Sequence, residues 1–415
     1  MRRWRLPLIL SAAILLSQLF RTPALLDVVR DAAPADVTLV YPFFHAVFAP
    51  FTLLADYLNG GSLGDLKGFA VWSVVCYVLW RLAGSSRQVA KSPSPVAREL
   101  RAAAVFLVAV AAFLWWGVRW GRPIPRLVAS DSALVIFDVH SHTAMSHDGR
   151  RGFGAASNAR WHERAGFDAA FVTDHNVFGA YREWEKDRNG HPPRLLAGEE
   201  LSLNGLHMVV LGNDAAIANK PWDQTFDSSL ALLRLLRDTG AASPRRPYVI
   251  ASLPEYARNH LGADLGRVIE AGTEGLEIWT TSPKAMDALP PSRRREVINR
   301  ARSLGIALFG ATDMHGLGYG ASVWNVARLP GWRALPDSSL GHALVAAVRA
   351  DPRGASRVIA RRRVFGETRL ARAFAVPMGL LLTVRSVPAP HVVALLVWCW
   401  IPALLRARRR EARPA

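Results

Sequence analysis

Histidines and carboxylates gather directly after a short apolar run near the middle of the chain. Residues 133–137 read Ala-Leu-Val-Ile-Phe; His140 and His142 follow two positions apart, and His147 and Asp148 come a few residues later. An apolar run of this length is typical of a buried strand, and residues two apart on a strand face the same way. His140 and His142 can therefore bind one metal ion. An isolated His-x-His pair is equally compatible with a polar loop after a core strand, so further ligands are needed to decide.

Potential ligands also follow later apolar runs. They are Asp174 and His175 after 169–173, Glu199 and Glu200 after 194–198, His207 at the start of 207–211, and Asp313 and His315 after 307–310. Imidazole and carboxylate ligands without cysteine suit zinc, manganese or iron in a hydrolytic site, where one carboxylate can bridge two ions. The two cysteines, Cys76 and Cys399, lie in apolar runs and support neither a disulfide framework nor a cysteine metal site.

Apolar runs alternate with amphipathic segments between residues 126 and 372, a pattern that predicts a parallel α/β architecture. Seven strands are predicted at 134–139, 169–173, 194–198, 207–211, 248–252, 275–279 and 307–310, with helices at 154–165, 228–239, 292–304 and 340–350. The candidate ligands fall at the C-terminal ends of at least five of these strands. We expect a closed barrel, because only a barrel brings so many strand ends around one mouth.

Four ordered motifs resemble the polymerase and histidinol phosphatase (PHP) family. They are Asp138-Val139-His140-Ser141-His142-Thr143, Thr173-Asp174-His175, Gly198-Glu199-Glu200 and Thr312-Asp313-Met314-His315, within roughly residues 134–320. The resemblance implies a distorted seven-stranded (β/α)7 barrel and a metal-dependent phosphoesterase, although some members of the family cleave other ester or carbamate bonds.

The resemblance also implies three metal positions. The first would use His140, His142, Glu200 and Asp313; the second would share Glu200 and use His207; the third would use His175, His315 and either Asp148 or His147. The histidine usual in the family after the fifth strand is replaced by Ser252, so the site either is dinuclear or recruits His260. We therefore expect two or three divalent ions of zinc, manganese or iron. His162, His191 and His342 match no motif and are expected to be surface or core residues.

The expected reaction is attack of metal-activated water on phosphorus. Asp313 would orient or deprotonate the water, and His175 or His315 would protonate the leaving oxygen. Arg150 and Arg151 either clamp the phosphate or form a solvated basic loop. The substrate would be a phosphorylated small molecule or another ester. The alternatives are a hydrolase of carboxylic esters, amides or carbamates, and a non-catalytic membrane-tethered module that binds metal or another ligand.

Apolar runs flank the predicted barrel and divide the chain into a membrane region at 1–126, the metallohydrolase domain at 127–372, and a membrane hairpin with a basic tail at 373–415. Spans are expected at 6–20, 37–58, 68–82, 102–118, 373–384 and 392–405. The net charge of +18 comes largely from basic residues beside these runs, which indicates topology more than nucleic-acid binding. We expect a protein of the bacterial inner-membrane type with a cytoplasmic central domain and no nucleic-acid partner. The basic loop between 81 and 101 conflicts with this orientation.

Overall fold

The computed structural model describes residues 4–85, 95–119, 121–187, 193–203, 206–217, 225–240, 245–254, 263–318 and 320–411. The chain forms two compact units. One consists of Met1–Thr22, Pro42–Pro123 and Arg363–Ala415, and the other of Pro23–Tyr41 and Ile124–Arg362. Residues 23–41, which the hydropathy pattern placed in the N-terminal membrane region, thus belong to the α/β unit. His191 and His260 lie outside the described residues.

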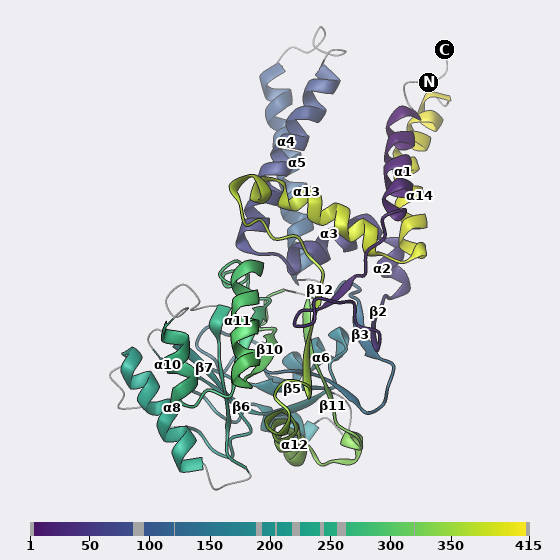
Figure 1. The fold of residues 1–415 in the computed structure, drawn as a ribbon. Coiled ribbons are helices and arrows are strands. Elements are labelled where there is room, and N and C mark those ends of the chain that lie inside the picture. The colour runs from purple at the N-terminus through teal and green to yellow at the C-terminus, as the bar shows by residue number, and fades with distance from the viewer. Residues whose placement is uncertain are drawn as a thin grey trace. The chain divides into compact units, whose positions relative to one another are not determined.

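The α/β unit is built on a curled ten-stranded sheet (Figure 1). Its order is β1 (Leu25–Asp27), β12 (Ser356–Arg361), β11 (Val323–Arg328), β4 (Leu134–Asp138), β5 (Ala169–Val172), β6 (Arg194–Leu203), β7 (Leu206–Leu211), β8 (Tyr248–Ala251), β9 (Gly275–Thr280) and β10 (Ala307–Ala311). β2 (Val37–Val40) and β3 (Arg126–Ala129) form a separate two-stranded ribbon.

All seven predicted strands are present as β4 to β10, which are consecutive in the sheet, but the prediction of a closed seven-stranded barrel is wrong, because the sheet has ten strands in an open order from β1 to β10. β1, β11 and β12 extend it beyond β4, and β11 runs antiparallel to both of its neighbours. These strands escaped notice because Asn325 interrupts the apolar run of β11 and arginines lie at both ends of β12. The sheet is also not all parallel, because β7 returns from β6 as an antiparallel hairpin.

The first and last of the seven predicted strands meet again just beyond their C-terminal ends. The Asp313 N–H donates to the His140 carbonyl at 2.9 Å, and the His142 N–H donates to the Met314 carbonyl at 2.8 Å. Deeper in the unit, the Asn325 side chain occupies the gap between β4 and β10 by bonding the backbone of Gly310 and the carbonyl of Phe137. The sheet therefore curls far enough to bring the ends of β4 and β10 together.

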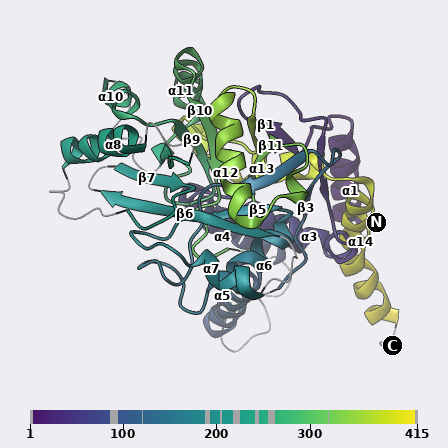
Figure 2. The same ribbon diagram turned by 90° about the horizontal axis from the view of Figure 1, so that it is seen from below.

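Both faces of the sheet are buried. Along β4, Val135 and Phe137 belong to one apolar cluster whereas Leu134 and Ile136 belong to another, as the alternation of side chains on a strand requires. Helices cover the sheet: α6 (Ala155–Ala165), α7 (Tyr181–Asp187), α8 (Phe226–Gly240), α10 (Ala263–Ala271), α11 (Pro291–Leu304) and α12 (Asp337–Ala350). Figure 2 shows α8 beside α10, and α6 beside α7, around the curled sheet. The four predicted helices correspond to α6, α8, α11 and α12.

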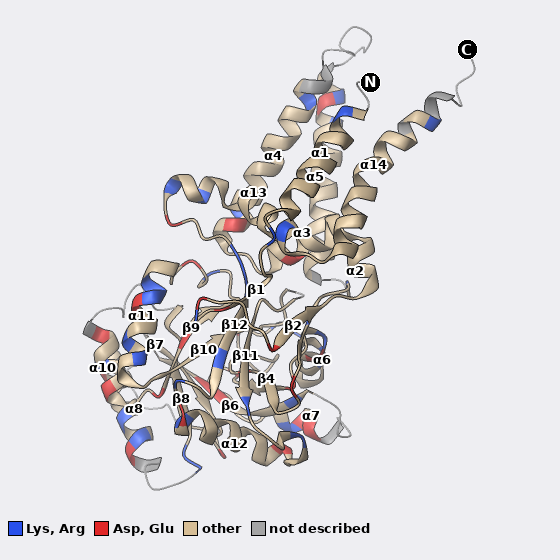
Figure 3. Cartoon of the chain, turned by 45° about the vertical axis from the view of Figure 1, so that its right-hand side comes forward, with Lys and Arg blue, Asp and Glu red and all other residues tan. Residues whose placement is uncertain are grey.

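The other unit is helical. It contains α1 (Arg5–Gln18), α2 (Phe43–Val47), α3 (Ala49–Asn59), α4 (Leu63–Ser85), α5 (Pro95–Arg119), α13 (Arg369–Ser386) and α14 (Ala389–Glu411). By length and composition, α4 and α5 can cross a membrane, at Leu63–Leu82 and Val96–Val118, and only 6% of each window is buried. Charged residues of these two helices lie toward their ends (Figure 3). The predicted single span at 37–58 is wrong, because β2, α2 and α3 divide it.

A buried polar cluster links the helices of this unit. His45 on α2 has its Nδ1 2.9 Å from His391 Nε2 on α14 and its Nε2 3.1 Å from Asp56 Oδ2 on α3. Arg122 donates to the other oxygen of Asp56. Polar groups buried among apolar helices are stabilised when they bond one another. The cluster therefore joins the N-terminal helices to the C-terminal hairpin.

Candidate metal centre

Histidines and carboxylates from several strand ends form three overlapping groups in the described part of the chain. Within each group the candidate ligand atoms all lie within 4.8 Å of one another. The groups are His142, Asp148, His175 and His315; His140, His142 and Asp313; and His175, Glu200 and His207. Of the residues assigned to the three implied metal positions, only His147 belongs to none of these groups. Asp174 and Glu199, also named as potential ligands, belong to none of them either, and His260 lies outside the described residues.

The first set of ligand atoms centres on His140 and His142, which follow β4. His140 Nε2 lies 2.9 Å from Glu200 Oε2 and 3.6 Å from Asp313 Oδ1. His142 Nε2 lies 3.2 Å and 3.4 Å from the same two oxygens. Two histidine nitrogens and two carboxylate oxygens thus face one point from the ends of β4 and β10 and from β6.

The four nitrogen–oxygen separations are compatible with a shared cation, and the two to Asp313 are longer than an ordinary hydrogen bond. Two ligand atoms each about 2.05 Å from a tetrahedral ion are about 3.3 Å apart, close to these nitrogen–oxygen distances of 2.9–3.6 Å. His142 is fully buried, yet neither of its ring nitrogens makes a hydrogen bond in the structure. Because buried polar atoms normally have partners, the donor set fits a divalent ion.

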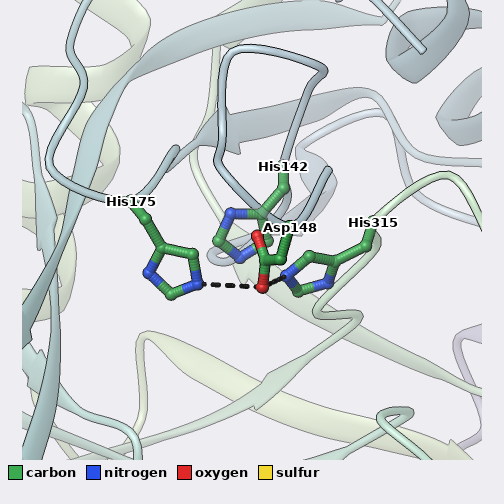
Figure 4. A group of neighbouring side chains, drawn as sticks. All are labelled: His142, Asp148, His175 and His315. Carbon is green, nitrogen blue, oxygen red and sulfur yellow. Dashed lines mark ion pairs between the residues drawn. The ribbon is translucent and has the colours of Figure 1, made fainter. Parts of the chain in front are cut away.

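A second set is formed by Asp148, His175 and His315 (Figure 4). Asp148 Oδ2 lies 3.3 Å from His175 Nε2 and 2.9 Å from His315 Nε2. The sequence left Asp148 and His147 as alternatives; Asp148 is the one that points between these two imidazoles, while the His147 ring packs 4.9 Å from the His175 ring. Gly149 makes this loop possible, because a Cβ there would lie 1.9 Å from the Thr143 carbonyl oxygen.

The third group, His175, Glu200 and His207, shares Glu200 with the first set and His175 with the second. His207 Nδ1 lies 2.7 Å from Glu200 Oε1, and His175 Nδ1 lies 3.2 Å from Glu200 Oε2. The hydroxyl of Ser252, at the position where the family resemblance leads us to expect a histidine, instead donates to Glu277 Oε2 at 2.6 Å. His207 is thus the one residue of this group that belongs to neither of the first two sets, because Glu200 belongs to the first and His175 to the second.

Carboxylates behind the ligands hold the strand ends in place. Asp138 accepts hydrogen bonds from Thr312 and from His162 Nε2, the latter at 3.0 Å. Asp174 accepts two from Thr143, at 2.6 and 2.8 Å from the backbone and the hydroxyl. His162, expected to be a surface or core histidine, is fully buried and links α6 to the end of β4.

Sequence reasoning missed Glu277. Its Oε1 lies 2.7 Å from His140 Nδ1, which leaves His140 Nε2 directed at Glu200 and Asp313. Burial raises the pKa of Glu277 against the lowering effect of His140. The signal was present: β9 reads Gly-Leu-Glu-Ile-Trp-Thr, with a carboxylate inside an otherwise apolar, fully buried strand. A carboxylate on the second nitrogen of a ligand histidine fixes the tautomer and orientation of the ring.

Burial and neighbouring charges act in opposite directions on the clustered groups. Burial alone would lower the pKa values of the histidines, but carboxylates raise the pKa of His140 well above its ordinary value and that of His142 to about 9. Burial alone would raise the pKa values of Glu200, Asp148 and Asp313, yet the imidazoles hold all three below their ordinary values. The cluster therefore places carboxylates that remain ionised beside imidazoles that lose a proton when a cation binds.

One side of the centre is open to solvent. The side chains of His140, His142 and Glu200 are at most 1% exposed, whereas Asp148 is 41% exposed and His315 20%. The exposed Arg150 lies on this side, where its backbone N–H donates to the His315 carbonyl at 2.9 Å and its guanidinium contacts the Gly316 carbonyl. A substrate can thus approach past Asp148 and His315.

No protein-family model matches the sequence, and no curated protein matches it convincingly. Several solved structures resemble part of the chain, and three of them are each 18% identical to it. A protein described as a metal-dependent phosphoesterase from Bifidobacterium adolescentis has a TM-score of 0.31 over 43% of this chain and 87% of its own. PsfC from Pseudomonas syringae has 0.35 over 48% and 83%. An amidohydrolase from Chromobacterium violaceum, with sulfate and no metal, has 0.29 over 47% and 92%. Such low scores support no functional assignment.

Proposed function

We propose that this protein is a membrane-anchored, metal-dependent hydrolase that cleaves phosphoesters. The observation that carries the proposal is the first ligand set, in which His140, His142, Glu200 and Asp313 face one point at ligand-to-ligand distances and neither ring nitrogen of His142 makes a hydrogen bond. Three of the four sequence motifs that resemble the PHP family contribute these residues. That resemblance favours phosphoesters over other substrates.

The proposed centre holds two divalent ions of zinc, manganese or iron. One would be bound by His140, His142, Glu200 and Asp313, and the other by Asp148, His175 and His315. A third ion would have Glu200 and His207 as its ligands, because Ser252 is bonded to Glu277 and His175 is already used. Two protein ligands are fewer than catalytic zinc sites use.

Divalent ions bound here would supply Lewis acidity and a water nucleophile of lowered pKa. Asp313 is proposed to orient the nucleophile, because its Oδ1 lies 3.4 Å from His142 Nε2 and 3.5 Å from His315 Nδ1 and so reaches both ligand sets. Its backbone is held in the left-handed region at φ 48°, a conformation that aspartate tolerates and that is frequent at functional sites.

His207 is the proposed source of the proton for the leaving oxygen. Its Nδ1 is held by Glu200, and its side chain is 16% exposed. His175, the candidate acid named from the sequence, has Nδ1 2.6 Å from Ser202 Oγ and Nε2 3.3 Å from Asp148. Both of its nitrogens are therefore engaged, which suits a ligand more than an acid. Arg150 is proposed to bind the phosphate oxygens, since a guanidinium matches phosphate geometry.

The helical unit is proposed to anchor the enzyme in a bilayer through α4 and α5, whose long apolar surfaces would otherwise face water. The basic flanks of the apolar segments favour a cytoplasmic α/β unit. The substrate is proposed to be a small phosphorylated molecule or a phosphoester carried at the membrane.

The test begins with elemental analysis of the full-length protein purified in detergent. Hydrolysis of p-nitrophenyl phosphate, bis-p-nitrophenyl phosphate and p-nitrophenyl acetate is then measured with the same preparation. We expect about two metal ions per chain and turnover of a phosphate substrate that falls to background in His140→Ala and Asp313→Asn. His342→Ala is the matched control, because His342 is partly exposed, pairs with Asp214 and belongs to no ligand group.

The outcomes separate the alternatives. Turnover of the acetate ester alone would replace the phosphoesterase assignment with a carboxylic-ester hydrolase. Bound metal without turnover of any substrate would favour a binding module. Phosphate hydrolysis that persists undiminished in both site variants would overturn the assignment of the centre.

A further inference from the structure

Helix α13 carries a stripe of exposed apolar side chains. Leu370, Phe374, Met378 and Leu381 are 71%, 47%, 50% and 42% exposed. Their spacing of four, four and three positions places them on one face of the helix. A continuous apolar face of this kind marks an interaction surface, unlike scattered exposed apolar residues.

The opposite face of α13 is packed by small residues. Ala375, Val376 and Gly379 are the buried residues of the helix. A Cβ added to Gly379 would lie 2.4 Å from the Tyr57 ring of α3, so the two helices are in close contact there. α13 is thus fixed within its own unit by one face, and its exposed stripe is presented outward.

α13 contacts α4 at Gly68 and Trp72, in the first half of α4. Pro377 has no N–H, so the Ala373 carbonyl lacks its helical donor; the Trp72 indole N–H of α4 donates to that carbonyl at 2.7 Å. The Trp72 ring also packs 5.7 Å from the Phe374 ring, and Val376 meets Gly68. α13 therefore touches α4 in the first half of the candidate span, one to five residues after Lys67, and runs across its direction (Figure 1).

Exposed basic residues lie at the start of α13 and on the neighbouring helix α4. Arg369 and Arg372 in the first turn of α13 and Lys67 on α4 are exposed, and Glu367 is the acidic residue just before α13. An apolar face beside exposed cations is the pattern of a helix that lies in a membrane interface, where anionic headgroups meet the basic side chains.

We propose that α13 lies flat in the lipid interface, with Leu370, Phe374, Met378 and Leu381 immersed in anionic bilayer, and does not cross the membrane. This replaces the span predicted at 373–384. The inference rests on the proposed membrane location of α4. α13 then fixes the height at which the helical unit sits in the bilayer.

The test compares label depth at two matched pairs of positions in the full-length protein. Cys76 and Cys399 are replaced by serine, single cysteines are placed at Leu370, Leu381, Val71 or Leu82, and spin labels are attached. All four native side chains are exposed. Both pairs are eleven positions apart, or about 16 Å along a helix axis. Depth is measured by oxygen and nickel-chelate accessibility in vesicles of phosphatidylcholine and phosphatidylglycerol.

We expect the α13 labels to share one shallow depth, about 5–10 Å below the headgroups, while the α4 labels differ by up to about 16 Å. A depth difference within α13 as large as that within α4 would overturn the inference and restore a crossing helix. Water-exposed α13 labels beside immersed α4 labels would also overturn it. If both α4 labels remain in water, the membrane location itself fails, a result distinct from either of these.

Discussion

Replacing Glu277 by glutamine is expected to weaken one metal site and leave the other intact. Glu277 contacts His140, a ligand of the first proposed ion, and its remaining oxygen accepts from Ser252. Glutamine keeps the size and one acceptor oxygen but removes the carboxylate charge that polarises the imidazole. The second ligand set, Asp148, His175 and His315, makes no contact with Glu277 in the described structure.

The magnitude follows from the role of a carboxylate behind a histidine ligand. Loss of such a partner typically costs about 10–100-fold in metal affinity, which corresponds to about 1.4–2.8 kcal/mol. Calorimetric titration of the full-length protein with Zn²⁺ or Mn²⁺ should therefore show one binding event weakened by that factor. The other event should keep its wild-type affinity.

Glu199→Gln provides the matched control. Glu199 is also a buried glutamate whose pKa is raised by burial, but its carboxylate accepts from the Ile217 backbone and not from a ligand histidine. Its substitution should leave both affinities unchanged. Equal losses in the two variants would show a general effect of removing a buried carboxylate, and unchanged affinity in Glu277→Gln would show that this carboxylate does not support His140 electrostatically.

Three further outcomes are expected. Because carboxylates raise the pKa of His142 to about 9, this histidine is protonated at pH 7; metal binding should release its proton, and apparent affinity should rise with pH up to about 9 and then level off. Calorimetry in buffers of different ionisation enthalpy measures the release, and an absence of proton release would contradict this. His162→Phe removes a buried donor to Asp138 and should lower unfolding stability by about 1–3 kcal/mol, so an unchanged melting curve would argue against the bond. Gly310→Ala places a Cβ 2.2 Å from Val323 and should cost about 1–3 kcal/mol through overpacking, measured by thermal unfolding; wild-type stability would mean that the strands separate easily.

Five of the seven predicted strands were predictable because their signal is local. Each of β4, β5, β8, β9 and β10 is buried along its whole length, so its sequence reads as a short apolar run. A fully buried strand has no solvent face that would interrupt that run. The order of the ligand-bearing motifs along the chain then placed their histidines and carboxylates at strand ends.

The missed features depend on tertiary partners. Asn325 breaks the apolar pattern of β11 because its side chain bonds the backbone of Gly310, a contact between segments distant in sequence. Glu277 is recognisable as part of the site only once His140 is seen beside it. The predicted span at 37–58 was wrong for another reason, because hydropathy does not distinguish a membrane helix from a strand followed by two short helices. Pro42, just before α2, was the sequence signal against a continuous helix.

The meeting of the β4 and β10 ends has a consequence for the order of assembly. His140 and His315 are separated by 175 positions, and the proposed ions need residues from nearly the whole interval. A nascent chain thus has no complete ligand set until β10 has been synthesised and has joined the sheet. A bound ion would connect the ends of β4 and β10. At a free concentration of 100 times its Kd it would add about 2.7 kcal/mol to the free energy of unfolding. In cells short of metal, the sheet of the unbound protein would then open more often, and proteases would cut the protein more readily.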